Sequence, residues 1–163
     1  MEKLATNYTG GQKMAHVSLN HPKLTLEGAE AILDAAKTQA ARIGVPMNIA
    51  VVDGGGNLVS HVRMDGAWIG SIDISINKAF TARAFDISTA QLSENSQPGQ
   101  QFYGIQNSNH GRVMIFAGGV PLRRNGSVVG AIGVSGGSGK QDQAVATAGA
   151  SAIVDDAVEA KVA

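Results

Sequence analysis

The chain has 163 residues, of which 44% are hydrophobic, and its 13 basic and 13 acidic residues cancel to a formal net charge of zero. A neutral chain with only 4% aromatic residues argues against binding to nucleic acid or to an anionic membrane surface. The absence of cysteine excludes disulfides and thiolate metal sites, and no apolar run approaches the ~20 residues of a membrane span.

This length predicts one domain over residues 1–163, with a tail at 1–11. The N-terminal stretch lacks the apolar segment of a signal peptide, so we expect a cytoplasmic protein. Zero net charge also does little to keep monomers apart, which favours self-association.

The first part of the chain predicts a helix followed by two strands. Thr25 is a good N-cap and Gly44 a good C-terminal stop, and the apolar residues between them recur every three or four positions. The run at 47–53 is apolar on both faces, which is typical of a central strand. After a glycine-rich turn, the run at 58–65 alternates between two faces and predicts a second strand.

A second helix is expected over residues 70–85, and a shorter one after it. Ser88 and Gln91 have the spacing of a capping box, which marks the start of that shorter helix. The stretch 97–112 has no clear period. It is long for a connection within a compact domain, and such loops are often functional.

A hairpin and a last helix complete the chain. Asn125-Gly126 predicts a type I′ turn between a first arm at 113–124 and a second arm at 127–134. A capping box at Ser138 opens a helix that we expect to run to about residue 159. Because hairpins outnumber strand–helix–strand units, this order predicts an α+β fold with an antiparallel sheet.

Several motifs carry a resemblance to a known family. They cover about residues 24–155 and include AVVDGGGNL at 50–58, RMDG at 63–66, KAFTA at 78–82, GGVPL at 118–122 and VGAIGVSGG at 129–137. In these motifs the chain resembles the GlcG/HbpS family of haem-degrading-type domains, which also resembles the C-terminal domain of PduO-type cobalamin adenosyltransferases.

This resemblance implies a PAS/profilin-like antiparallel sheet of about five strands flanked by helices. It also implies a homo-oligomer, from dimer to octamer, and a small-molecule ligand, with haem or another tetrapyrrole as the first candidate. Two other classes of function stay open. One is an enzyme of a catabolic pathway that acts on a small carboxylate intermediate, and the other is a non-catalytic accessory or assembly protein.

The charged residues Asp53, Arg63, Asp65 and Lys78 are the candidates for acid–base chemistry. Asp53 and Asp65 each end a predicted strand, Arg63 shares a strand face with Asp65, and Lys78 lies on the following helix. Together they would form a carboxylate-binding or proton-transfer pocket, with Lys78, Asp53 and Asp65 in the catalytic roles. The same residues would equally form a salt-bridge network that fixes the second helix on the sheet.

His110 is the candidate metal ligand if the cofactor is haem. A haem site needs an apolar slot, an axial ligand and cations for the propionates. The stretch 97–112 offers His110, Tyr103 and Arg112, and Arg63 supplies a second arginine. We therefore expect a site between the second helix, the strand end at 63–65 and this stretch. The alternative is that His110 is an exposed loop histidine.

Overall fold

The computed structural model of the protein describes residues 22–153. These residues form helices α1 (Leu26–Ile43), α2 (Ser71–Phe85), α3 (Thr89–Asn95) and α4 (Gly139–Ala150), strands β1 (Asn48–Asp53), β2 (Leu58–Arg63), β3 (Gly119–Arg124) and β4 (Ser127–Ser135), and two short 3₁₀ helices at Ile105–Asn107 and Asn109–Gly111. The tail expected at 1–11, and the part of the last expected helix after residue 153, lie outside the described residues.

The four strands form one antiparallel sheet in the order β2-β1-β4-β3. The predicted α+β class with an antiparallel sheet is confirmed, and the described residues contain four strands where about five were expected. None of the helices within residues 22–153 is long and apolar enough to cross a membrane.

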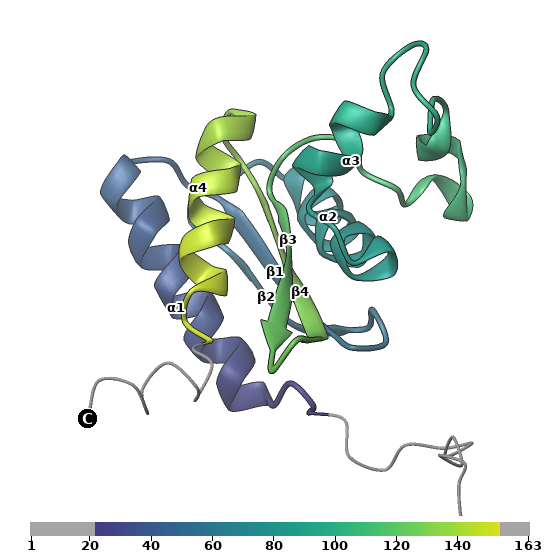
Figure 1. The fold of residues 1–163 in the computed structure, drawn as a ribbon. Coiled ribbons are helices and arrows are strands. Elements are labelled where there is room, and N and C mark those ends of the chain that lie inside the picture. The colour runs from purple at the N-terminus through teal and green to yellow at the C-terminus, as the bar shows by residue number, and fades with distance from the viewer. Residues whose placement is uncertain (1–21, 154–163) are drawn as a thin grey trace, which may run out of the picture.

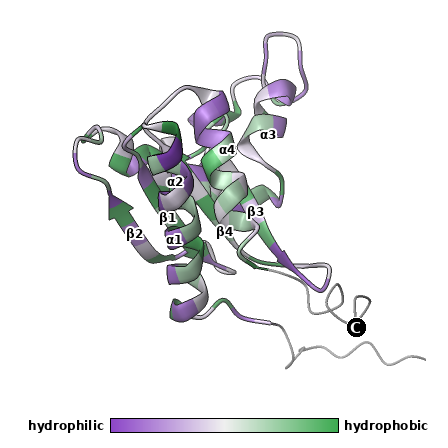
Figure 2. Ribbon diagram, turned by 90° about the vertical axis from the view of Figure 1, so that its left-hand side faces the viewer, coloured by the Kyte–Doolittle hydropathy of each residue, from purple (hydrophilic) through white to green (hydrophobic). Residues whose placement is uncertain are grey.

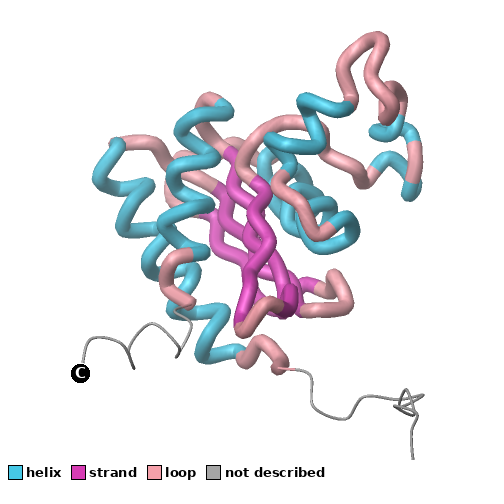
Figure 3. The backbone as a smooth tube through the Cα atoms, viewed as in Figure 1, coloured by secondary structure: helices cyan, strands magenta, loops and turns pink. Residues whose placement is uncertain are grey.

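The sheet separates two layers of helices. Figure 1 shows α1 and α4 on one side of the sheet and α2 on the other, and Figure 3 shows the strands as a twisted layer between them. Ile49 and Val51 of β1 pack in the core with α1 and α4, whereas Ala50 and Val52 face α2. In Figure 2 the central strands carry the hydrophobic colour, and hydrophilic colour marks the tip of the β3–β4 hairpin.

The β3–β4 hairpin has the predicted turn but a shorter first arm. Asn125 and Gly126 both have positive φ, at 49° and 77°, as a type I′ turn requires. The prediction of a strand from residue 113 is wrong, because β3 begins only at Gly119. Along 113–118, backbone N–H groups donate to side chains, such as Met114 to Thr81 Oγ1, and Gly118 has a φ of 116° that breaks the extended chain.

Two helix boundaries illustrate the local signals. Thr25 caps α1 by accepting a hydrogen bond from the Gly28 N–H, and Ser138 forms the predicted capping box with Gln141 at the start of α4. Helix α4 ends at Ala150, so the last expected helix does not continue through residues 151–153. Its last turn tightens into i→i+3 hydrogen bonds through residue 153, as helix ends commonly do.

Helix α2 lies unusually close to the sheet. A Cβ atom on Gly133 of β4 would be 2.0 Å from the Ser75 carbonyl oxygen, so the backbones of α2 and β4 are in direct contact. The α2 residues that are buried are small or polar, and they are Ser71, Ser75, Lys78, Ala79, Thr81 and Ala82. The layer between α2 and the sheet therefore contains few large apolar side chains.

Candidate functional site

The structure separates the charged residues that the sequence grouped. Register pairs Asn48 with Arg63, so Asp53 and Arg63 lie at opposite ends of the β1–β2 hairpin. Arg63 and Asp65 are exposed. Lys78 is fully buried against the sheet. Asp53 and Lys78 therefore have different surroundings and do not share one pocket.

Asp53 organises the turn between β1 and β2. Its Oδ1 accepts hydrogen bonds from the N–H of Gly55 at 2.8 Å and of Asn57 at 2.9 Å. The hydrogen bond from the Asn57 backbone is the main cause that holds the pKa of Asp53 below its usual value. This carboxylate is therefore ionised near neutral pH and shapes the turn as an acceptor.

Lys78 and Asp142 form a buried ion pair. The Lys78 Nζ lies 2.7 Å from Asp142 Oδ2, donates to the Val134 carbonyl oxygen at 2.9 Å, and sits 4.4 Å from the centre of the Phe116 ring. Asp142 Oδ1 accepts from the Gly137 N–H. Burial lowers the pKa of Lys78, and the hydrogen bond and charge of Asp142 act in the opposite direction. The pair links α2, β4 and the start of α4.

The stretch that carries His110 projects from the body of the molecule. Figure 1 shows it beyond α3, at the opposite end of the sheet from the β3–β4 turn. His110 and Tyr103 are exposed, and Tyr103 retains 67% of its accessible surface. Arg112 instead turns back to α2, where its guanidinium stacks 3.7 Å from the Phe80 ring centre and its Nε donates to Asn77.

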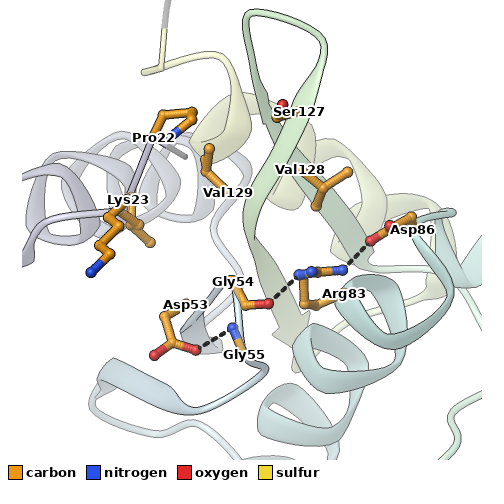
Figure 4. Close-up of a pocket in the computed structure, with 11 residues that line it drawn as sticks. Pro22, Lys23, Asp53, Gly54, Gly55, Arg83, Asp86, Ser127, Val128 and Val129 are labelled. Carbon is orange, nitrogen blue, oxygen red and sulfur yellow. Dashed lines mark hydrogen bonds and ion pairs between the residues drawn. The ribbon is translucent and has the colours of Figure 1, made fainter. Parts of the chain in front are cut away.

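A cavity of about 660 Å³ lies at the other end of the sheet, and Asp53 is the one predicted site residue in its described lining. It is lined by residues 22–24 before α1, residues 53–55 after β1, Arg83 and Asp86 at the end of α2, and residues 127–129 at the start of β4. Figure 4 shows these segments converging on the cavity. They are up to 107 residues apart in sequence (129 − 22), so no local pattern reveals that they meet.

Two basic and two acidic side chains line this cavity, and they are Lys23, Arg83, Asp53 and Asp86. Arg83 donates from Nε to the Gly54 carbonyl oxygen at 2.7 Å and forms an ion pair with Asp86 (Figure 4). Lys23 has no ion pair within residues 22–153, and Leu24 and Val129 provide apolar walls. The described lining thus offers apolar contact, a lysine without an ion pair, and the Asp53 carboxylate that accepts hydrogen bonds from its own turn.

The cavity meets some of the requirements of a haem site but, among the described residues, lacks an axial ligand. The cavity has the size and mixed lining typical of small-molecule sites. Its described lining contains no histidine, methionine or tyrosine that would coordinate iron axially. Of the two histidines within residues 22–153, His110 is exposed, whereas the Nε2 of His61 is buried. Of these two histidines, His110 therefore has the more accessible ring.

Comparison with known proteins finds a matching family and similar proteins. The model of a family described as "Haem degrading protein HbpS-like" matches residues 24–151. An uncharacterized 15.0 kDa protein from the dhaT-dhaS intergenic region of Citrobacter freundii is 44% identical over 123 residues, which cover 76% of this chain and 87% of that protein.

Two solved structures share the fold. The Klebsiella pneumoniae protein ORFY is 38% identical and superimposes with a TM-score of 0.82, over 86% of this chain and 97% of the other. PduOC, whose structure is a complex with haem, is 34% identical with a TM-score of 0.78, over 81% of this chain and 96% of the other.

Proposed function

Since the chain belongs to the HbpS-like family of haem-degrading proteins, we propose that it binds haem or a closely related tetrapyrrole. The observation that carries this proposal is the haem complex of PduOC, a relative 34% identical to this chain. Haem would supply an iron centre for ligand binding or electron transfer. The contribution of the protein would be to hold the macrocycle, supply an axial ligand and neutralise the propionates.

We propose His110 as the axial ligand. Its side chain is exposed, as coordination of an incoming haem requires, whereas the Nε2 of His61 is buried. Tyr103 offers an exposed aromatic surface on the same stretch. Arg112 is held near by Phe80, and its Nη donors would pair with a propionate.

The cavity at the end of the sheet is the competing location. There Leu24 and Val129 would contact the macrocycle and Lys23 would pair with a propionate. The axial ligand would then come from outside the described lining. The two locations are at opposite ends of the sheet, so substitutions at one leave the other intact.

Titration of the full chain with haemin tests both the function and the location. We expect a shifted Soret band for the wild-type protein. His110→Ala should change that band and weaken binding about tenfold or more, because an axial ligand is lost. Val128→Trp, which fills the cavity, should leave binding unchanged, and His61→Ala is the matched histidine control.

Two results would contradict the proposal at different levels. Loss of binding in Val128→Trp, with His110→Ala unaffected, would move the site to the cavity. The protein concentration should be well above the dissociation constants typical of haem sites. A wild-type spectrum identical to that of free haemin under these conditions would exclude haem binding itself.

A further inference from the structure

Two buried polar atoms on neighbouring strands have no hydrogen-bond partner within residues 22–153. They are Asn48 Oδ1 on β1 and His61 Nε2 on β2. Asn48 is fully buried, with 0% of its surface exposed. Buried polar atoms are nearly always hydrogen-bonded in folded proteins, so each of these atoms requires an explanation.

The strand register places these two side chains on the same face of the sheet. His61 lies directly opposite Ala50, and Asn48 lies two residues before Ala50, so Asn48 and His61 form a diagonal pair. Diagonal neighbours are within reach when a side chain is long or aromatic. Ala50 faces α2, so both side chains point to the α2 side of the sheet.

The amide of Asn48 has a fixed orientation. Its Nδ2 donates to the Trp68 carbonyl oxygen at 2.9 Å, and the Ser71 N–H donates to the same oxygen at 3.1 Å. Exchange of the amide nitrogen and oxygen would set two carbonyl oxygens against each other, so Oδ1 is the atom that lacks a partner.

The surroundings are polar. Beside Asn48, the hydroxyl of Ser135 donates to that of Ser71 at 3.1 Å, and both serines are buried. The segment 68–71 leads into α2, and its Trp68 carbonyl oxygen contacts the Asn48 side chain. A small polar molecule held here would therefore meet hydrogen-bonding groups rather than an apolar wall.

We propose that one buried water molecule bridges Asn48 Oδ1 and His61 Nε2 beneath the segment 68–71. Two hydrogen bonds of about 2.8 Å each span roughly 5–6 Å, which suits a diagonal pair of side chains. The water donates one proton to Asn48 Oδ1. It forms its second hydrogen bond with the neutral ring of His61, either as donor or as acceptor.

The charge state of His61 agrees with a neutral bridge. Burial lowers the pKa of His61, and the adjacent Arg63 lowers it further, so the ring is uncharged near neutral pH. Among the described residues, Arg63 is the charged group whose field contributes to this lowering of the His61 pKa. The bridge would join β2, an edge strand of the sheet, to the central strand β1 through side chains as well as backbone.

The sign of a stability change tests the bridge. His61→Phe keeps a planar aromatic ring of somewhat larger size and removes both ring nitrogens. If water bridges the two atoms, the loss of one partner should raise the unfolding equilibrium constant roughly fivefold or more. If Nε2 is buried without any partner, the same substitution removes an unfavourable group and should lower that constant. Ser60→Ala, on the opposite face of β2, is the control.

A double-mutant cycle with Asn48→Leu completes the test. A shared water predicts that the effects of His61→Phe and Asn48→Leu are non-additive, whereas independent sites predict additivity. A crystal structure of the full chain should show one ordered water within hydrogen-bond distance of both atoms. If the variants do not fold, that structure decides alone, and lack of water density there would overturn the proposal.

Discussion

Lys78→Met is expected to destabilise the protein strongly. The substitution keeps the side chain out to Cε but removes the charged Nζ that pairs with Asp142, whose carboxylate stays buried with only the Gly137 N–H at Oδ1. The Val134 carbonyl oxygen loses its donor as well. Breaking one partner of a buried ion pair costs about 3–5 kcal/mol. For a domain of this size that corresponds to a melting temperature lower by about 6–20 °C.

Urea unfolding followed by circular dichroism measures this cost. The same substitution at Lys37, whose pair with Asp34 is on the surface, should cost about 1 kcal/mol or less. The double variant Lys78→Met/Asp142→Leu should recover most of the lost stability, because no unpaired charge remains. If Lys78→Met costs no more than Lys37→Met, the buried pair does not hold α2 to the sheet and the reasoning fails.

Three further predictions concern the hairpin, the α2 contact and pH. Gly126→Val should cost about 1–3 kcal/mol, because a β-branched residue is forced to a φ of 77°. Gly126→Asn should cost far less in urea unfolding, because asparagine tolerates positive φ and a Cβ there meets no other part of the described chain within 4 Å beyond its neighbours. Gly133→Ala should cost about 1–3 kcal/mol or more, since its Cβ would strike the Ser75 carbonyl, and an unchanged midpoint would contradict that contact. Because burial lowers the pKa of His61 from 6.5, the unfolded chain binds its proton more readily; thermal stability should therefore fall as the pH drops below about 6.5, and His61→Phe should flatten that dependence.

The sequence predicts best those elements whose signals are local. The caps at Thr25 and Gly44 bound α1, and Asn125-Gly126 marks the hairpin turn, because each of these depends on a few adjacent residues. The resemblance to the GlcG/HbpS family is also confirmed, since its motifs extend through the chain.

The site is predicted less well because its parts are distant in sequence. Asp142 and its partner Lys78 lie 64 residues apart in the sequence, and no periodicity reports such a contact. Lys78 was grouped instead with Asp53, which bonds to its own turn. The first arm of the hairpin is shorter than its apolar run predicts, because such a run does not reveal that its N–H groups donate to side chains such as that of Thr81.

The difference between the two faces of the sheet has a consequence for the order of folding. On one face, α1 and α4 bury large aliphatic side chains, which drive collapse without exact alignment. On the other, α2 meets β4 through Gly133 and the Lys78 ion pair, which become favourable only when backbones and charges are in their final places. We therefore expect the layer of α1, α4 and the central strands to be formed in the transition state, with α2 docking after the barrier and showing low φ-values.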